Sequence, residues 1–305
     1  MNDSIAIKTE NLTKRFGSNI AVDNLNLEIK RGELFGLVGP DGAGKTTTMR
    51  LLTAIMDPTG GEAWIAGHSI INEGETIKEK IGYMSQRFGL YEDLTVMENI
   101  LFYADIYEVP KIERPKRIER LLGFSNLTPF KDRLAGRLSG GMKQKLGLAC
   151  ALIHTPDVLF LDEPTNGVDP VSRRDFWKIL YDLLREGVTI FVSTAYLDEA
   201  ERCTSIGLIH KGKILITDTP EKIKKSIGIP TIEMWTEDSR NTAEIIRRSG
   251  DIKGVSIYGD KLHIAITKRE SIGSIITQLK NAGVDVKEYR EILPSIEDIF
   301  ISMVN

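Results

Sequence analysis

The sequence predicts an α/β domain built on a mostly parallel sheet, followed by a small α+β domain. Three observations lead to this prediction. Over the first 220 residues, short apolar runs typical of buried strands alternate with amphipathic helical stretches. Buried-strand runs are absent between residues 87 and 156, which indicates a helical insertion. After about residue 220 the expected elements follow the order β-α-β-β-α-β, which is typical of a ferredoxin-like unit.

The length of the chain agrees with this division. The chain has 305 residues, and at roughly 100–200 residues per domain this favours two domains. We assign residues 1–220 to the α/β domain, with the helical insertion at about 87–156, and residues 221–305 to the appended domain.

The expected elements of the first domain follow from their apolar periodicity. Alternating apolar and polar residues predict half-buried strands at Ile5–Lys8 and Leu25–Ile29. Continuous apolar runs predict buried strands at Leu34–Gly39, Val158–Leu161 and Val188–Ser193. Helical periodicity predicts helices at Thr46–Met56, Leu94–Tyr107, Lys111–Gly123 and Ser172–Glu186. Strands that alternate with helices in this way predict a mostly parallel sheet covered on both faces.

The appended domain is predicted from the same patterns. Strands are expected at Ile232–Thr236, Val255–Tyr258, Leu262–Thr267 and Val284–Tyr289. Helices are expected at Thr242–Ser249, Ser271–Ala282 and Ser295–Val304.

Composition excludes several classes of function. The chain has 40 Lys+Arg and 43 Asp+Glu, a net charge of −3, which argues against a generally basic nucleic-acid binder. Its two cysteines provide no disulfide framework, and its four histidines form no pair at metal-ligand spacing. The chain has no run of roughly 18 apolar residues and no secretory signal, so we expect no transmembrane segment. A reducing cytosol is expected, which is compatible with docking on the inner face of a membrane protein.

The segment Gly39-Pro-Asp-Gly-Ala-Gly-Lys-Thr46 fits the phosphate-loop pattern G-x-x-x-x-G-K-[ST]. A buried strand precedes it and a helix follows it, which argues against a plain glycine turn. Successive backbone N–H groups of such a loop point at one anion, and the helix adds its positive end. Lys45 is expected to reach the β- and γ-phosphates, and Thr46 to bind Mg²⁺. The predicted phosphate-binding residues are Gly39, Asp41, Gly42, Ala43, Gly44, Lys45, Thr46 and Thr47.

Two adjacent carboxylates end the apolar run Val158–Leu161. Asp162 is suited to hold Mg²⁺, and Glu163 is suited to act as a base that polarises the attacking water. Without a phosphate loop, two carboxylates after an apolar run would be equally well explained as residues at the N-terminus of a helix. Beside a phosphate loop, the pair predicts an ATP-hydrolysing site.

The run Leu138-Ser-Gly-Gly-Met142 precedes a predicted helix. In one interpretation Ser139 only caps that helix. In the other, Ser139 and the N–H groups of Gly140 and Gly141 form a second anion site.

Together these motifs resemble the nucleotide-binding subunit of an ATP-binding cassette (ABC) transporter, over about residues 5–220. The order is that of the family: phosphate loop, Gln86, the 138–142 signature, the acidic strand, then Asn166-Gly-Val-Asp169. Met142 stands where many members have Gln. Within the family the chain is most similar to ABC-2-type exporters of drugs, antibiotics or polysaccharides. The C-terminal segment Leu293–Phe300 is similar to theirs as well.

The resemblance implies ATP and Mg²⁺ as cofactors, with further roles for named residues. Gln86 would contact Mg²⁺ and the water and relay nucleotide state to the membrane partner. Phe16 would stack on adenine, with a core phenylalanine as the alternative. Asp169 would lie in a loop that communicates across a dimer, in which the signature of one cassette closes over the nucleotide of the other. The implied partners are membrane permease subunits and a second cassette, with no nucleic acid, at the cytoplasmic face of the cell membrane.

One position departs from the family pattern. The family usually has a histidine at the γ-phosphate after the last buried strand, and here Ala195 stands in its place. Losing one such donor from a preorganised site costs about 10²–10³ in rate. Either a nearby group or an ordered water substitutes and hydrolysis continues, or this site binds ATP with slow turnover beside an active partner cassette. Lys45, Gln86, Asp162 and Glu163 favour the first hypothesis.

Three functions compete on this evidence: an exporter ATPase, a nucleotide-dependent switch, and a cassette protein that acts on ribosomes or DNA. The third is disfavoured by the single phosphate loop, by the near-neutral charge, and by the short separation of Lys45 from Ser139. Co-purification with a polytopic membrane protein separates it from the first two. Phosphate release by that complex then separates exporter from switch.

Overall fold

A computed structural model provides the fold. It describes residues 4–86, 89–226, 228, 230–248 and 252–304. The chain divides into two units. The first contains Met1–Tyr196 and Cys203–Ile214, and the second contains Leu197–Arg202 and Leu215–Asn305.

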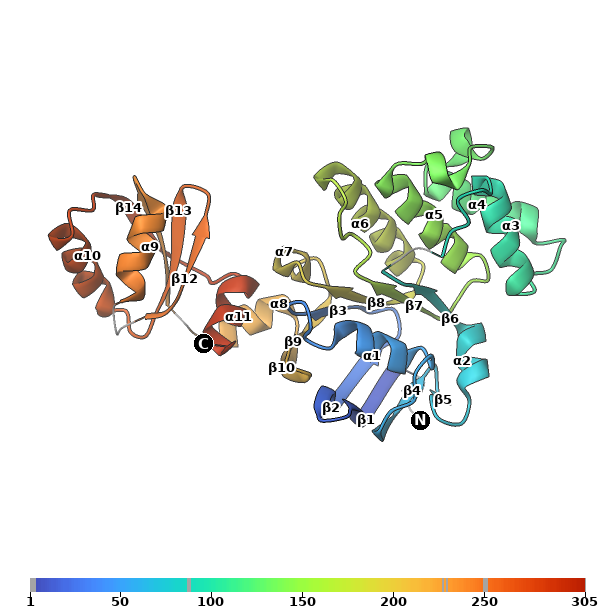
Figure 1. The fold of residues 1–305 in the computed structure, drawn as a ribbon, viewed down its shortest axis with the longest axis horizontal. Helices are drawn as coiled ribbons and strands as arrows, with labels where there is room; N and C mark the ends of the chain where they lie inside the picture. Colours follow the sequence, from blue (N-terminus) through green and yellow to red (C-terminus); the bar gives the residue numbers. More distant parts are fainter. Residues whose placement is uncertain (1–3, 87–88, 227, 229, 249–251, 305) are drawn as a thin grey trace. The chain divides into compact units, whose positions relative to one another are not determined.

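The central sheet has six strands, drawn in Figure 1: β3 (Leu34–Val38), β6 (Ile81–Met84), β7 (Val158–Asp162), β8 (Thr189–Thr194), β9 (Ser205–His210) and β10 (Lys213–Asp218). Their order is β10-β9-β3-β8-β7-β6. The pairs from β9 to β6 are all parallel, as predicted. β3, β7 and β8 are buried along their whole length, which explains why each reads as a continuous apolar run.

A second, antiparallel sheet holds β1 (Ile5–Phe16), β2 (Asn19–Lys30), β4 (Gly60–Ile65) and β5 (His68–Ser69). The predicted strands Ile5–Lys8 and Leu25–Ile29 are parts of β1 and β2. Both strands are longer than predicted because register shifts after Thr9 break the apolar alternation while backbone pairing continues.

The helix α1 (Lys45–Leu52) lies between these two sheets and packs against strands of both (Figure 1). It ends four residues before the predicted Met56. Thr53 closes it, and Ala54 takes a left-handed φ of 53°, which cannot continue a right-handed helix.

The helical insertion contains α3 (Val96–Ile106), α4 (Arg114–Phe124), α5 (Gly140–Leu152) and two single 3₁₀ turns, Thr128–Phe130 and Ala135–Arg137. Among the described residues between β6 and β7 no strand occurs, as predicted. Thr95 starts α3 through a capping box with Glu98. On the opposite face of the central sheet from α1, α5 packs on β6 and α6 (Pro170–Arg185) packs on β8 (Figure 1). α2 (Gly74–Lys80) precedes β6.

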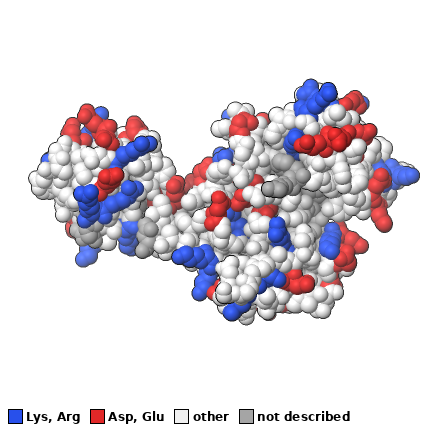
Figure 2. Space-filling view, viewed as in Figure 1, with Lys and Arg blue, Asp and Glu red and all other residues white. Residues whose placement is uncertain are grey.

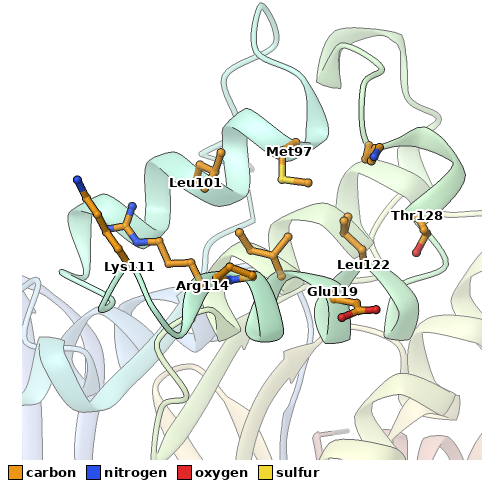
Figure 3. Close-up of a pocket in the computed structure, with 10 residues that line it drawn as sticks. Met97, Leu101, Lys111, Arg114, Glu119, Leu122 and Thr128 are labelled. Atoms are coloured by element: carbon orange, nitrogen blue, oxygen red, sulfur yellow. The ribbon is translucent and has the colours of Figure 1, made fainter.

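An apolar groove of about 560 Å³ lies between α3 and α4 (Figure 3). Met97 and Leu101 line it from α3 and Leu122 from α4, with Lys111 and Arg114 at one end. Its described lining holds no glycine loop and no pair of carboxylates. The groove therefore lacks the chemistry that a triphosphate requires.

The second unit contains β11 (Thr231–Thr236), β12 (Ile252–Tyr258), β13 (Lys261–Ile266), β14 (Val286–Ile292) and the helices α7 (Leu197–Ala200), α8 (Pro220–Ser226), α9 (Ser239–Arg247), α10 (Ser271–Asn281) and α11 (Ile296–Val304). Its sheet is antiparallel with the order β12-β13-β11-β14. From β11 to β14 the elements follow the predicted order β-α-β-β-α-β. α9 starts before the predicted Thr242 because Asp238 caps it, and Ser249 lies outside the described residues.

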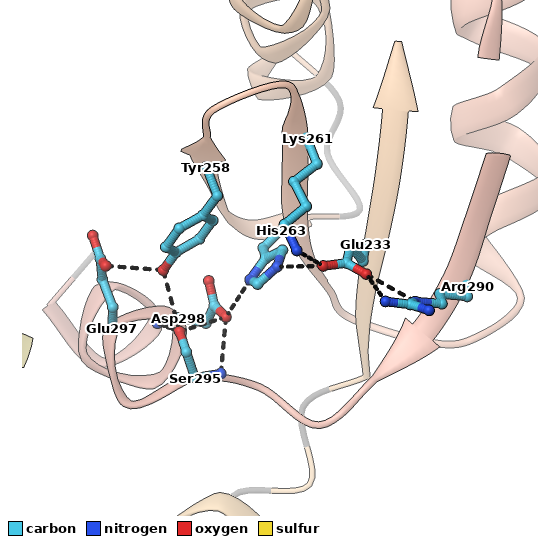
Figure 4. Close-up of polar contacts among 8 residues, drawn as sticks. All are labelled: Glu233, Tyr258, Lys261, His263, Arg290, Ser295, Glu297 and Asp298. Carbon is cyan, nitrogen blue, oxygen red and sulfur yellow. Dashed lines mark hydrogen bonds and ion pairs between the residues drawn. The ribbon is translucent and has the colours of Figure 1, made fainter. Parts of the chain in front are cut away.

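A polar cluster joins this sheet to α11 (Figure 4). Glu233 of β11 is 3% exposed and pairs with Lys261, with Arg290 and with Nε2 of His263, the last at 3.3 Å. Nδ1 of His263 lies 3.0 Å from Oδ2 of Asp298, which starts α11 by accepting from the Ser295 N–H. These contacts hold the last helix of the chain to β13.

Surface charge is mixed in sign. On the face drawn in Figure 2, the described lysines and arginines lie interspersed with aspartates and glutamates. That face therefore presents no continuous basic stripe of the kind that follows a nucleic-acid backbone. Within the described residues, no helix is both long and apolar enough to cross a membrane.

Candidate functional site

The phosphate loop connects β3 to α1, as predicted from the sequence. Gly44 precedes the helix at a φ of 105°, and a Cβ there would lie 2.3 Å from the carbonyl oxygen of Ala21. A Cβ on Gly39 would lie 2.2 Å from the carbonyl oxygen of Ile209. Both positions therefore require glycine, and the loop is held tightly against β2 and β9.

Lys45 points back into the loop. Its Nζ donates to the carbonyl oxygens of Gly39 (2.8 Å) and Pro40 (3.1 Å) and lies 3.1 Å from Oε1 of Glu163. The side chain is only 4% exposed. A buried ammonium with several donors is suited to bind a phosphate oxygen as a point charge.

Asp162 ends β7 beside the start of α1. Its Oδ1 accepts hydrogen bonds from Ser193 Oγ (2.5 Å) and Thr46 Oγ1 (3.3 Å), while its buried Oδ2 has no hydrogen-bond partner among the residues that the structure describes. Burial raises the pKa of this carboxyl group, because the low-dielectric surroundings disfavour its charge. An unpartnered carboxylate oxygen beside a threonine hydroxyl fits Mg²⁺, which prefers oxygen ligands. The residues present therefore fit the expected ion.

Glu163 follows Asp162 and is held by donors on both carboxylate oxygens. Its backbone N–H donates to the Ser193 carbonyl and hydroxyl oxygens at 3.1 Å each, and its φ is 49°. Oε1 faces Lys45, and Oε2 accepts from Gln86 Nε2 (2.9 Å) and Asn166 Nδ2 (3.3 Å). The structure thus brings Gln86, Glu163 and Lys45 together, although they are far apart in the sequence.

A cavity of about 740 Å³ opens over these groups. Phe16 lies on its wall with 48% of its surface exposed, so it is not a core residue. The described lining contains Phe16, Asn19, Ile20, Ala21, Asp41, Gly42, Gly44, Lys45, Thr46, Thr47, Gln86, Glu163, Asn166 and Lys211. Of the predicted phosphate-loop residues, Gly39 and Ala43 are buried and do not line the cavity. The cavity combines an aromatic wall with a phosphate-binding end, as a nucleotide requires.

The Leu138–Met142 signature lies apart from this cavity. Ser139 caps α5 by accepting from the Met142 N–H (3.3 Å), as in the simpler of the two interpretations. None of Ser139, Gly140 and Gly141 lines the cavity within the described residues. Asp169 caps α6 by accepting from the N–H groups of Val171 and Ser172. The side-chain hydrogen bond with Ser172, together with these backbone bonds, lowers the pKa of Asp169. The signature therefore does not complete the phosphate site of its own chain.

Ala195 lines a smaller cavity of about 170 Å³ next to the main one. Asp41, Glu163, Asn166 and Tyr196 line it too. The methyl group of Ala195 leaves this space unfilled, on the side of Glu163 where the expected histidine would stand.

The sequence-based prediction gave no role at the site to the polar residues Asn19, Asn166, Tyr196 and Lys211, which line the two cavities. Asn166 and Tyr196 follow the carboxyl ends of the neighbouring parallel strands β7 and β8. That position is a usable signal, because ligands of open α/β sheets bind at this edge. Asn19 starts β2 and Lys211 lies in the turn before β10, where no sequence pattern marks a site.

Comparison with known families matches both parts of the chain. Residues 22–166 match the family described as ABC transporter. Residues 219–304 match the family described as ATP-binding protein DrrA1-3-like, C-terminal domain.

Curated relatives extend the similarity over the whole chain. The probable multidrug ABC transporter ATP-binding protein YbhF of Escherichia coli (strain K12) is 42% identical over 100% of this chain and 53% of its own length. This chain thus spans about half of that relative. The bacitracin transport ATP-binding protein BcrA of Bacillus licheniformis is 33% identical, over 99% of this chain and 98% of its own. The daunorubicin/doxorubicin resistance ATP-binding protein DrrA of Streptomyces peucetius is 32% identical, over 98% and 92%.

Solved structures are similar to about 70–73% of this chain. An ATP-binding subunit of an ABC transporter superposes with a TM-score of 0.67 at 28% identity, over 73% of this chain and 93% of that one. The ATP-binding cassette MJ0796, in a dimeric post-hydrolysis state bound to ADP and Pi, gives 0.63 at 30% identity, over 70% and 98%.

Proposed function

This chain belongs to the ABC transporter family of ATP-binding proteins, and on that premise we propose that it hydrolyses ATP to power an exporter. One observation carries the proposal. Lys45 and Gln86 both contact Glu163 at the floor of a cavity that also has an exposed aromatic wall. Binding groups and a potential base for water thus meet in one place.

The chain's own residues would bind the nucleotide as follows. The loop Gly39–Thr47 would surround the phosphates with backbone N–H groups and the Lys45 ammonium. Phe16 would stack on the adenine. Thr46, Gln86 and Asp162 would hold Mg²⁺, which supplies charge neutralisation on the β- and γ-phosphates.

Hydrolysis would start with a change of partner for Lys45. The Lys45–Glu163 contact of 3.1 Å occupies both groups. When Lys45 turns to the phosphates, Oε1 of Glu163 becomes available to accept a proton from water. Attack of that water in line with the departing ADP oxygen then depends on positioning and on charge stabilisation, as phosphoryl transfer generally does.

A second cassette would complete the site. The signature residues Ser139, Gly140 and Gly141 stand outside their own chain's cavity, with open space at Gly140. In a symmetric dimer they would close over the nucleotide held by the other chain, with Asp169 in the loop between the two sites. ATP would then favour the closed dimer and hydrolysis would release it.

The partners and the cargo class follow from the relatives. Proteins named for multidrug, bacitracin and daunorubicin/doxorubicin transport or resistance are similar over nearly the whole chain. We therefore propose a drug- or antibiotic-type ABC-2 exporter, with permease subunits in the membrane and this chain at their cytoplasmic face. The helical insertion, joined to the site through Gln86, would transmit the nucleotide state to the permease.

Ala195 supports a second candidate function. Without a histidine beside the γ-phosphate, the site would bind ATP and turn it over slowly, as a nucleotide-dependent switch next to an active partner cassette.

Glu163→Gln tests the choice between the two. In the complex with its permease, the exporter proposal expects phosphate release to fall by about 10²–10⁴-fold, because the base is lost, while ATP binding stays. A variant that releases phosphate like the wild type would show that this site is not the hydrolytic one. Absence of turnover by the wild-type complex would favour the switch.

A further inference from the structure

A chain of hydrogen bonds runs from Tyr196 to the carboxylate of Glu163. The Tyr196 hydroxyl donates to Oδ1 of Asn166 at 3.4 Å, and Nδ2 of Asn166 donates to Oε2 of Glu163 at 3.3 Å. All three side chains line the small cavity at Ala195. Both bonds are longer than the usual range, as catalytic hydrogen bonds often are when no substrate is bound.

Tyr196 is fixed at both of its ends. Its backbone N–H donates to Oγ1 of Thr194, at the end of β8. Its ring packs under the guanidinium of Arg173 from α6, with Cζ 4.2 Å from the ring centre. The hydroxyl therefore has a defined position, set by a buried strand and a long helix rather than by a loop.

The two neighbours of Asn166 fix how its amide is oriented. An amide side chain presents either its oxygen or its NH₂ group to a neighbour, whereas an ionised carboxylate can only accept. Asn166 therefore turns its NH₂ group toward Glu163, and its oxygen accepts from the Tyr196 hydroxyl. Without that hydroxyl, the oxygen end of the amide would lose this donor.

We infer that Asn166 and Tyr196 are positioning residues for the hydrolytic step, an inference that rests on the proposed ATPase function. Once Lys45 moves to the phosphates, Oε1 of Glu163 loses its donor, whereas Gln86 and Asn166 still hold Oε2. The carboxylate is then oriented with Oε1 free to take the proton from water. In this chain the Asn166–Tyr196 pair supports Glu163 from the side on which Ala195 leaves a cavity.

Tyr196→Phe tests the inference, because it removes only the hydroxyl. We expect kcat of the permease complex to fall about 3–10-fold with KM and ATP affinity unchanged, since positioning acts on the transition state. Tyr107→Phe is the matched control: it removes a tyrosine hydroxyl in the helical insertion and should leave kcat unchanged. An unchanged kcat for Tyr196→Phe, with Glu163→Gln inactive, overturns the inference and leaves the proposed function intact. A wild-type complex without turnover overturns both.

Asn166→Asp supplies a readout that a merely structural role would not move. The variant keeps the acceptor for Tyr196 but replaces the donor with a second carboxylate near Glu163. The second carboxylate would repel Glu163 instead of donating to it, so kcat should fall further than in Asn166→Ala while KM for ATP stays unchanged. A kcat of Asn166→Asp no lower than that of Asn166→Ala contradicts the inference.

Ala195→His completes a double-mutant cycle. The 170 Å³ cavity has room for an imidazole ring next to Glu163. If the added ring supports the site from the same side, kcat should rise and Tyr196→Phe should cost less in that background. Equal losses in both backgrounds, together with a kcat of Asn166→Asp no lower than that of Asn166→Ala, would reduce Tyr196 to a packing residue and overturn the inference.

Discussion

Single glycines in the phosphate loop are fixed by the backbone around them. Gly44→Ala combines a φ of 105° with a contact of 2.3 Å to Ala21, so we expect it to cost at least about 2 kcal/mol in the free energy of unfolding. Gly17→Ala is the matched control, with a φ of 59° and nothing within 4 Å, and should cost about 1 kcal/mol. Urea unfolding measures both. Equal losses would mean that the loop relaxes around the added methyl group.

We expect Phe16 to contribute to ATP affinity but little to the stability of the fold. Phe16→Ala should weaken ATP binding by about 1–3 kcal/mol, the usual contribution of a stacked base. Because the ring is 48% exposed, the unfolding midpoint should change little. Phe16→Tyr keeps the aromatic face and should bind like the wild type. Calorimetric titration with ATP measures the affinities, and wild-type affinity in Phe16→Ala would remove Phe16 from the nucleotide site.

The sequence predicts the site residues whose spacing is local. It does not predict the contact between residues that only the fold brings together. The phosphate loop is contiguous and Asp162–Glu163 end a visible apolar run, so both were found. Asn166 and Tyr196 lie 30 residues apart and meet only because β7 and β8 are neighbours in the sheet. No sequence pattern encodes that pairing by itself.

Elements were predicted well where burial is continuous. β3, β7 and β8 are buried on both faces and agree with the predicted runs to within two residues at each end. β4 and β5 were missed because β4 is only partly buried and β5 has two residues. β9 is almost fully buried, but it lies in a stretch where no strand was predicted. α1 was overextended because apolar periodicity continues through Ile55 and Met56 after the helix has ended.

The polar cluster on β11 and β13 predicts a pH-dependent stability of the appended fold. The hydrogen bond from Lys261, with those from Arg290 and His263, lowers the pKa of Glu233 from 4.5 to about 2. The carboxylate therefore stabilises the folded state fully above about pH 4.5, and this contribution is lost as the pH falls toward 2.

Glu233→Gln should remove that contribution, at a cost of about 1–3 kcal/mol at pH 7. Hydrogen exchange of peptides from β11 and β13, compared at pH 7 and pH 3.5, measures it locally once rates are corrected for pH. The difference from wild type should shrink at the lower pH. Glu288→Gln on the exposed side of β14 is the control and should change neither value. A difference that grows at pH 3.5 would contradict the assigned direction.

The whole molecule gives a prediction about two copies of the chain. Lys45→Ala removes the phosphate-loop ammonium, and Ser139→Arg blocks the signature, so each variant alone should lack turnover. Mixed in equal amounts, they should recover up to about a quarter of the wild-type rate, because half of the dimers then carry one intact composite site. Phosphate release by the mixed complex measures this. No recovery would mean that the signature does not act on the other copy's nucleotide.

The division of the chain into units bears on how such proteins can be recombined. The chain leaves the first unit after Tyr196, returns at Cys203 and leaves again after Ile214. Residues 197–202 therefore group with the C-terminal unit, although 93 residues of sequence (203–295) separate them from its helix at 296–304. A chimera that takes only residues 215–305 from a relative would therefore join two lineages inside one packing unit. Exchanging residues 197–202 together with 215–305 keeps that unit from one parent. The short segment directly after Tyr196 is then exchanged as part of the C-terminal unit.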